Sequence, residues 1–236
     1  MKNFVYVIAD ADTRECVLVD ACWDVPGILG IVDKYGLKPV GAVVTHCHFD
    51  HVGGLPPPPF DQFRIRVTGL ATLIKKFPKM KGYIHALDLQ VILKESNPGL
   101  DKERFVLTED GFEMTLGSKT KLKFLHTPGH TRGSQCILVN DNRLLSGDTL
   151  FLGCCGRLDM PGASIDAMWS SLMRLRSLDE EVVVYPGHCY GGDWTTVGEE
   201  KLGGALKEIS LSTWRRKMRE RQVESSDEED TVTPAT

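Results

Sequence analysis

The stretch THCHFDHVGG, residues 45–54, places three histidines and one aspartate within six positions of a chain that has only seven histidines. Neutral imidazole and carboxylate are the protein ligands that zinc, iron and manganese commonly take. Neighbouring side chains on one tight loop diverge, so this spacing allows two adjacent metal ions to share the loop. A lone histidine after a strand more often has a structural role, but four potential ligands so close together favour a metal site. The candidate ligands are His46, His48, Asp50 and His51.

Three further positions can complete such a site. His130 lies in TPGHT, Asp148 in SGDT and His188 in YPGH, and each follows an apolar run and directly follows a glycine. Taken singly, PGH and GD are weak signals, because many loops begin with glycine and a polar residue. Open sheets bind ligands at their strand ends. We therefore expect one rim of a sheet to gather all seven candidates.

The elements that position these residues alternate short apolar runs with turn signals over the first 200 residues. A wholly apolar run such as 40–44 indicates a strand buried on both faces. Four prolines at 56–59 exclude a helix or central strand and predict a stiff loop. A strand-rich half, a helix, a second strand-rich half and another helix predict an α/β (α+β) fold: two mixed sheets packed together with helices outside. Strands are expected at 4–9, 16–21, 40–44 and 83–84, in five runs between 105 and 150, and at 182–185; helices are expected at 25–35, 70–77, 87–93, 164–178 and 197–221.

Composition narrows the classes of function. The chain is 42% hydrophobic and 25% charged, with 28 basic and 32 acidic residues and a net charge of −4. This balance predicts neither a nucleic-acid partner nor a basic membrane surface, and no apolar run approaches the roughly 18 residues of a membrane span. The N-terminal MKNFVYVIAD reads as a strand rather than a signal peptide. Seven cysteines without regular spacing favour a reducing compartment, so we expect a cytoplasmic protein.

The motifs THCHFDH, TPGHTRGS, SGDTLF, CCGRLD and YPGHCYGG, in this order, resemble the metallo-β-lactamase superfamily and, within it, the glyoxalase II-like hydrolases. The resemblance runs from about Asn3 to about Glu200 and implies an αββα sandwich with a dinuclear metal site at one edge of the sheets. It assigns His46, His48 and His130 to the first metal ion, and Asp50, His51 and His188 to the second. Asp148 would bridge the two ions. No ligand position of the family is empty, which favours an active enzyme.

Two divalent metal ions, with zinc expected first and iron or manganese as alternatives, define the chemistry that this resemblance implies. Such a pair lowers the pKa of a bound water enough to give hydroxide at neutral pH, and it polarises a substrate carbonyl. The expected reaction is hydrolysis of an activated acyl bond, such as a thioester, without a protein nucleophile. Asp148 and Asp50 are the predicted catalytic carboxylates, and Asp50 can also hold the water or carry its proton.

The resemblance also indicates a substrate, since glyoxalase II enzymes hydrolyse hydroxyacyl-glutathione thioesters. Tyr190 matches a family tyrosine near the glutathione backbone, and Arg157 matches a basic position that can pair with a glutathione carboxylate. Two departures weaken this match. Asp159 stands where an aromatic contact is usual, and the C-terminal helical domain that adds basic contacts is missing from the pattern after Glu200.

Two other functions remain open. Persulfide dioxygenases share the fold and the GR-x-D segment, here Gly156–Asp159, and they use one iron held by two histidines and a carboxylate. In this chain that triad would be His46, His130 and Asp148. A non-enzymatic metal-binding role is the third possibility. Metal identity and oxygen uptake with glutathione persulfide separate the three.

The end of the chain changes character. A basic stretch, RRKMRERQ, is followed by the acidic SSDEED and a small polar end. We predict a metallo-β-lactamase-like domain over residues 1–222 and a disordered acidic tail over 223–236. Ser225 and Ser226 each have a glutamate three residues on, a context that suits an acid-directed kinase.

Several residues that could suggest a site are given structural roles instead. We expect His85 to satisfy a local backbone group and His126 to pack without a metal. Alternation around its neighbouring ligands turns Cys47 away from the site. The adjacent Cys154 and Cys155 are expected to pack, because adjacent cysteines rarely chelate one metal and no CxxC partner exists.

Overall fold

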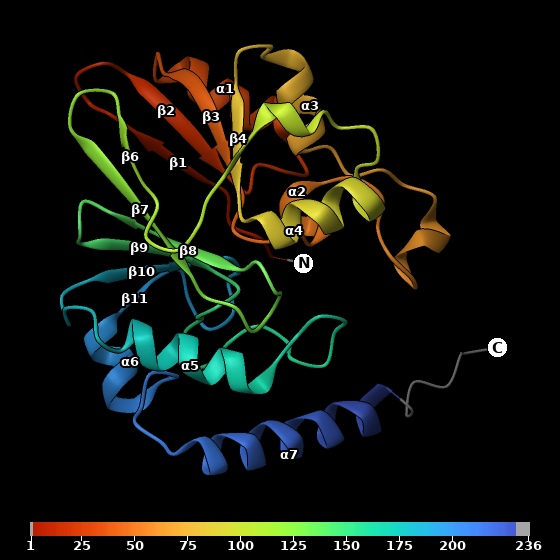
Figure 1. Ribbon diagram of the computed structural model, residues 1–236, viewed down its shortest axis with the longest axis vertical. Coiled ribbons are helices and arrows are strands. Elements are labelled where there is room, and N and C mark those ends of the chain that lie inside the picture. The colour runs from red at the N-terminus through yellow and green to blue at the C-terminus, as the bar shows by residue number, and fades with distance from the viewer. Residues whose placement is uncertain (1, 230–236) are drawn as a thin grey trace.

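Two mixed β-sheets packed face to face form the centre of the computed structural model, and helices cover their outer faces (Figure 1). The backbone of residues 2–229 and the side chains of residues 2–221 are described. This arrangement confirms the predicted αββα sandwich. The first sheet has the order β1 (Tyr6–Ala9), β2 (Glu15–Val19), β3 (Lys38–Val43), β4 (Lys81–Ile84), β5 (Phe105–Leu107). The second has the order β11 (Thr195–Thr196), β10 (Val183–Pro186), β9 (Arg143–Gly147), β8 (Gln135–Val139), β7 (Thr120–His126), β6 (Glu113–Leu116).

Strand β2 shows how side-chain alternation builds the layers. Successive side chains of a strand point to opposite faces of its sheet. Cys16 and Leu18 pack into the core beneath helices α1 (Val25–Lys34) and α3 (Leu70–Lys76), whereas Val17 and Val19 join the core between the two sheets. Because both sets are fully buried, β2 is apolar at each of these positions.

The outer face of the second sheet is covered by α5 (Ile165–Leu175), α6 (Val197–Gly203) and α7 (Leu211–Glu229) (Figure 1). Ser164 caps α5, since its hydroxyl accepts a hydrogen bond from the Ala167 N–H. Trp214 of α7 donates its indole N–H to the carbonyl of Ile165, which docks α7 on α5. Within the described part of the chain, no helix combines the length and apolar character needed to cross a bilayer.

Several element boundaries differ from the sequence expectation. The helix expected over 197–221 is two helices, α6 and α7, because α6 ends at Gly203–Gly204 and glycine disfavours helix. Strand β3 begins at Lys38 and is partly exposed in its first half, so burial on both faces applies only to its end. Helix α4 (Ala86–Val91) is followed by a π-helical turn, Ile92–Ser96, instead of ending near residue 93. Helix α7 continues past the expected boundary at 222 to Glu229, in keeping with its many arginine, glutamate and lysine residues, which favour helix. The predicted disorder of the remaining residues, 230–236, lies outside the described residues. Two short 3-10 helices, Phe60–Phe63 and Lys102–Arg104, and the four-residue α2, Phe49–Val52, complete the elements.

A buried carboxylate joins the two sheets at the far end of β1. Asp10 accepts hydrogen bonds from the Thr13 N–H at 3.0 Å and, across the sandwich, from the Lys119 N–H and the Thr120 hydroxyl, both at 3.1 Å. The Thr13 N–H does most to lower the pKa of Asp10, burial opposes it, and the Lys119 N–H adds to the lowering. Asp10 therefore stays ionised and joins the β6–β7 turn to the first sheet.

We predict that Asp10→Asn lowers the melting temperature most at neutral pH. A carboxyl group whose pKa is lower in the folded than in the unfolded state stabilises the fold above its unfolded pKa of about 4, and this stabilisation is lost as the pH falls. The difference in melting temperature between wild type and variant should therefore decrease as the pH falls from about pH 5 to about pH 3. Thermal unfolding followed by circular dichroism measures it. A gap independent of pH would contradict an ionised Asp10.

Candidate metal centre

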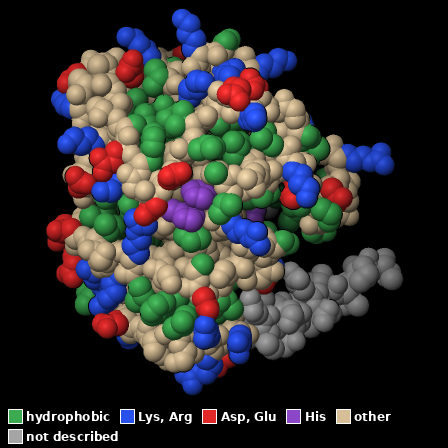
Figure 2. Space-filling model, in the orientation of Figure 1, with side chains coloured by type: hydrophobic (Ala, Val, Ile, Leu, Met, Phe, Trp, Pro, Cys, Tyr) green, Lys and Arg blue, Asp and Glu red, His purple; other side chains and the backbone are tan. Residues whose placement is uncertain are grey.

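All seven predicted ligands lie at one rim of the sandwich, where several strands end. His46 and His48 follow β3, and the short helix α2 carries Asp50 and His51. The others follow β7, β9 and β10, each after its glycine. Figure 2 shows histidine side chains at the surface near the middle of the face in view, between the two halves of the molecule, although His46, His51, His130 and His188 are themselves buried. The expected convergence is therefore present.

The potential ligand atoms of the predicted residues form two groups, and within each group they lie within 4.8 Å of one another. A third such group joins Asp20, which was not predicted, to His46 and His51. One group is His46, His48 and His130, whose ring centroids are 4.5 to 4.8 Å apart. We call it the three-histidine half. The other group is Asp50, His51 and His188, which we call the Asp–His–His half.

Asp148 lies between the two halves. Its Oδ1 is 3.4 Å from the Nε2 of His51, and its Oδ2 is 3.4 Å from the Nε2 of His130 and 3.3 Å from that of His188. Gly187 permits this approach, because a Cβ there would lie 2.4 Å from the Asp148 Oδ1. The position is the one that a bridging carboxylate needs.

Three of the imidazoles are held through Nδ1, which directs Nε2 into the centre. The Nδ1 of His51 is 2.9 Å from a carboxylate oxygen of Asp20, that of His130 is 2.9 Å from the carbonyl of Arg157, and that of His46 is 3.1 Å from the Thr45 hydroxyl. Such partners set the tautomer and orientation of a metal-binding histidine. The Nε2 atoms of His46 and His130 are buried and have no hydrogen-bond partner among the described residues.

The electrostatic surroundings favour a positive charge at the centre. Burial, with the neighbouring imidazoles, lowers the pKa of His46 well below its ordinary value and leaves its lone pair available. Burial also opposes protonation of His51, but the carboxylates of Asp148, Asp20 and Asp50 outweigh it and raise the pKa of His51 to about 10. A metal ion can supply the charge that these carboxylates require.

The donor set fits two divalent ions. Ligand atoms of a tetrahedral zinc site lie about 3.3 Å from one another, given metal–nitrogen distances near 2.0 Å. The separations between Asp148 and its histidine neighbours, and the 3.1 Å between the Nε2 atoms of His51 and His188, are of this size. Nitrogen and oxygen donors suit zinc, iron and manganese alike.

Two supporting residues were not identified from the sequence. Asp20 binds His51 and also accepts hydrogen bonds from the N–H (2.8 Å) and hydroxyl of Thr45. Asn3 donates its side-chain N–H to the Asp50 Oδ2 and to the Asp50 carbonyl, both at 3.0 Å. Asp20 carries the signal that identified the other ligands, a polar residue directly after a buried strand, whereas Asn3 lies in an irregular segment without one.

The residues given structural roles lie outside both groups of ligands. The ring of His126 stacks on that of His85 with a centroid distance of 4.0 Å, and the Nδ1 of His85 accepts a hydrogen bond from the Leu87 N–H. Cys155 packs against the core beneath α5, and burial raises its pKa to about 12, so it remains a thiol.

The two predicted substrate-binding residues both lie beside the ligands. The ring of Tyr190 stacks on His188, with centroids 4.9 Å apart, and is 46% exposed. Arg157 follows Gly156, and its guanidinium forms two hydrogen bonds with the carboxylate of Asp159, at 3.0 and 2.7 Å. This ion pair lowers the pKa of Asp159 and offsets much of the charge that Arg157 could offer a substrate.

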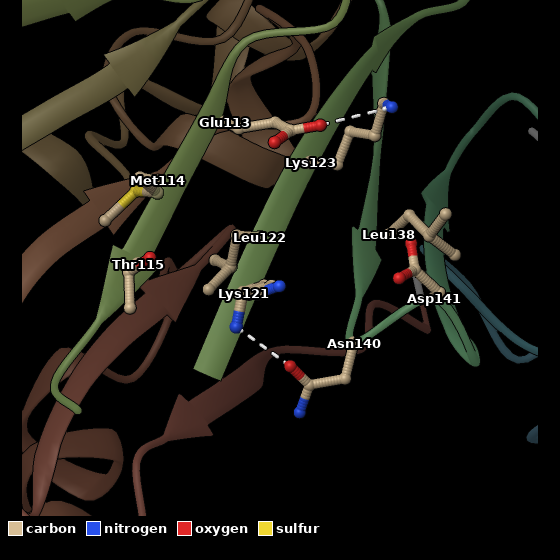
Figure 3. A pocket seen from close by; sticks show the side chains of 9 residues that line it. All are labelled: Glu113, Met114, Thr115, Lys121, Leu122, Lys123, Leu138, Asn140 and Asp141. Carbon is tan, nitrogen blue, oxygen red and sulfur yellow. Dashed lines mark hydrogen bonds and ion pairs between the residues drawn. The ribbon is translucent and has the colours of Figure 1, made fainter. Parts of the chain in front are cut away.

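A separate shallow pocket of about 250 Å³ lies on β6, β7 and β8 (Figure 3). A Lys123–Glu113 ion pair at 3.2 Å spans part of it, and the side chain of Asn140 accepts the Lys121 N–H at 2.8 Å. None of the predicted site residues lines this pocket, so we place no catalytic function there.

Comparison with known proteins agrees with this geometry. The family model described as "Metallo-beta-lactamase superfamily" matches residues 2–188. PksB of Bacillus subtilis (strain 168), a "probable polyketide biosynthesis zinc-dependent hydrolase", is 28% identical over 195 residues, covering 80% of this chain and 74% of the relative. Human mitochondrial persulfide dioxygenase ETHE1 is 26% identical over 202 residues, covering 84% and 68%. The crystal structure of TTHA1623 "in a di-iron-bound form" is 29% identical, with a TM-score of 0.67 over 86% of this chain and 93% of that one.

We predict that the protein binds two equivalents of zinc, iron or manganese. His46→Ala and His188→Ala should each remove one equivalent, because they open different halves of the site. His126→Ala, a histidine outside both groups, is the matched control and should remove none. Elemental analysis after reconstitution measures the content, with circular dichroism as a check of folding. Full metal content in both ligand variants would refute the assignment.

Proposed function

The chain belongs to the metallo-beta-lactamase superfamily, and from this premise we propose that it hydrolyses an activated acyl bond, specifically a glutathione thioester, at a dinuclear metal centre. The observation that carries the proposal is the completeness of the centre. Three histidines form one half, an aspartate and two histidines form the other, and Asp148 faces both. The similarity to a zinc-dependent hydrolase and to a protein solved with two irons supports it.

His46, His48 and His130 would hold the first ion, Asp50, His51 and His188 the second, and Asp148 both. When bound, these ions supply Lewis acidity toward a substrate carbonyl and acidify water held between them. In the proposed reaction water adds to the acyl carbon, the carbon–sulfur bond breaks, and the thiol leaves with a proton.

Asp50 is the residue placed to hold that proton. Its Oδ2 lies 3.5 Å from the Nε2 of His188, and the amide of Asn3 fixes it at 3.0 Å. The indole of Trp23 and the thiol of Cys22 both donate to the Asp50 carbonyl, so its backbone is held as well. A carboxylate fixed at the site in this way can receive a proton from water and return it to the leaving thiolate.

Substrate recognition would come from the exposed side of the centre. Tyr190 presents a half-exposed ring above His188, backed by an edge contact with Phe151 at 5.3 Å. Arg157 offers a cation for a glutathione carboxylate, although Asp159 competes for it. Helix α7 packs on α5 through Trp214, and the positive charge of its Arg221 acts on the thiols of Cys154 and Cys155, close to Arg157 in the chain.

We predict slow-to-moderate hydrolysis of lactoyl-glutathione with a high KM. Arg157→Ala should raise that KM about two- to fivefold, because an exposed ion pair contributes at most about 1 kcal/mol. Asp159→Asn is the matched variant and should lower KM, since it removes the carboxylate that competes with the substrate. Steady-state kinetics of both variants measures the effect, and kcat should stay near the wild-type value.

A thioester with the same acyl group but no carboxylate is the control substrate, and its KM should not respond to either variant. Equal changes for both substrates would show that Arg157 and Asp159 affect the fold of the rim rather than glutathione.

Mononuclear iron persulfide dioxygenation is the second candidate function, favoured by the similarity to ETHE1 and by the Arg157–Asp159 pair within the GR-x-D segment. Its triad would be His46, His130 and Asp148. Oxygen uptake with glutathione persulfide by the iron-loaded protein, without thioester turnover by the zinc-loaded protein, would select this function instead.

We also propose that an acid-directed kinase acts on Ser225 and Ser226, in a reducing compartment such as the cytoplasm, where the seven free cysteines would stay reduced. These serines lie past the part of α7 that carries Trp214 and Met218 into the core beneath α5. Phosphate there would add negative charge to an acidic segment.

We therefore predict that deleting residues 224–236 leaves thioester turnover and metal content unchanged. Steady-state kinetics and elemental analysis of the truncated protein test this. A large loss of turnover with retained metal would show that the segment contributes to the substrate site.

A further inference from the structure

A buried aspartate on α4, Asp88, connects the two loops that supply the three-histidine half. It is 1% exposed and lies in a helix that is otherwise largely apolar, ALDLQV. Its Oδ2 accepts the N–H of Cys47 at 2.9 Å and the hydroxyl of Thr131 at 2.7 Å, and its Oδ1 accepts the N–H of Gly133 at 2.7 Å. One side chain thus takes three short hydrogen bonds from two loops that are more than 80 residues apart in sequence.

Two of the three bonded residues, Cys47 and Thr131, are direct neighbours of predicted metal ligands, and Gly133 lies three residues after His130. Cys47 lies between His46 and His48, so its N–H belongs to the backbone that sets the separation of those two histidines. Thr131 follows His130, and its hydroxyl also contacts Ser134 at 2.7 Å. Asp88 itself touches no ligand side chain in these contacts, so it can act on the ligands only through the backbone that carries them.

The chain after His130 is shaped to receive this carboxylate. A Cβ on Gly133 would lie 2.6 Å from the Cγ of Asp88, closer than real contacts allow, so only glycine lets the loop approach. The Ser134 hydroxyl accepts the Thr131 N–H at 3.0 Å and closes the turn. The turn TRGS, residues 131–134, thus gives Asp88 one hydroxyl and the glycine N–H, while the Ser134 hydroxyl supports the turn itself.

We propose that Asp88 is a positioning residue that holds the loops of His46, His48 and His130 in register and so sets the metal affinity of the three-histidine half. This rests on the proposed metal centre. Outer partners of metal ligands commonly contribute about ten- to a hundredfold in metal affinity. Asp88 has the geometry to contribute this much, because a shift of either loop would separate the histidines that bind together. Asp20 and Asn3 anchor the Asp–His–His half, and Asp20 also holds Thr45 beside His46, but neither residue bonds the Cys47 N–H or the loop after His130.

Asp88→Asn tests the proposal with little change in volume. The amide nitrogen must face either the Gly133 N–H or the Cys47 N–H, and both are donors, so at least one hydrogen bond is lost in either orientation. Titrating the metal-free protein with cobalt(II), followed by visible absorption, should show two binding steps in the wild type. The step that His46→Ala removes should weaken about ten- to a hundredfold in Asp88→Asn, and the other step should change far less.

A conservative pair of variants gives a milder test should Asp88→Asn fold poorly. Thr131→Val removes the hydroxyl that bonds Asp88 and should weaken the same step. Thr131→Ser keeps the hydroxyl and should restore it. Asp10→Asn is the matched control: it also disrupts a buried, multiply bonded carboxylate, so it should lower the melting temperature and leave both cobalt steps unchanged.

The outcomes separate this inference from the proposed function. Two normal cobalt steps in Asp88→Asn and Thr131→Val would overturn the positioning role while leaving the metal centre intact. Equal weakening of both binding steps in Asp88→Asn, or the same weakening in Asp10→Asn, would show that Asp88 only stabilises the fold. Either result would also overturn the positioning role. A wild type without any cobalt step would instead refute the metal centre.

Discussion

The structure depends on the charge balance at one buried rim, where the carboxylates of Asp20, Asp50 and Asp148 meet five imidazoles. Burial disfavours every charged form there, yet the three carboxylates raise the pKa of His51 to about 10. Protonated imidazole can satisfy them only in part, because burial and its imidazole neighbours keep His46 neutral. Divalent cations meet both demands, since they neutralise the carboxylates and accept the lone pairs of the neutral histidines.

A centre of this kind requires ligands that do not move when charge enters or leaves. Here the rigidity comes from buried hydrogen bonds behind the ligands. Asp20 holds His51 and Thr45, while Asp88 holds the backbone on both sides of the three-histidine half. The strands alone bring the loops to one rim, but a strand end leaves its loop several degrees of freedom. The anchoring carboxylates remove that freedom, and each is itself satisfied by donors, as a buried charge must be.

The sequence was most informative where chemistry is local. Four ligands stand within six residues, and each of the other three follows a glycine at the end of an apolar strand, so pattern alone assembled all seven. The layers were equally accessible, because alternation along β2 and the apolar stripe of α5 reflect burial directly. The residues that hold the ligands in place could not be predicted in this way. Asp88 bonds Cys47 across 41 positions of the sequence, and Asn3 bonds Asp50 across 47. Such pairs depend on tertiary packing, which the periodicity of a local sequence segment does not reveal. The limits of β3 and α4 differed for the same reason, since neighbouring elements decide where a strand or helix ends.

Substrate choice follows a different logic from metal binding. Six of the seven predicted ligands are buried and contact one another, whereas the side chains of Arg157 and Tyr190 lie on the exposed side of the centre. A change there alters affinity without disturbing the charge balance. The Arg157–Asp159 pair illustrates this: an acid two residues from the arginine reduces its attraction for a carboxylate while the carbonyl of Arg157 still orients His130. In the proposed function, Arg157 thus serves the metal centre through its backbone carbonyl and the substrate through its side chain, and a change of the side chain leaves the carbonyl in place.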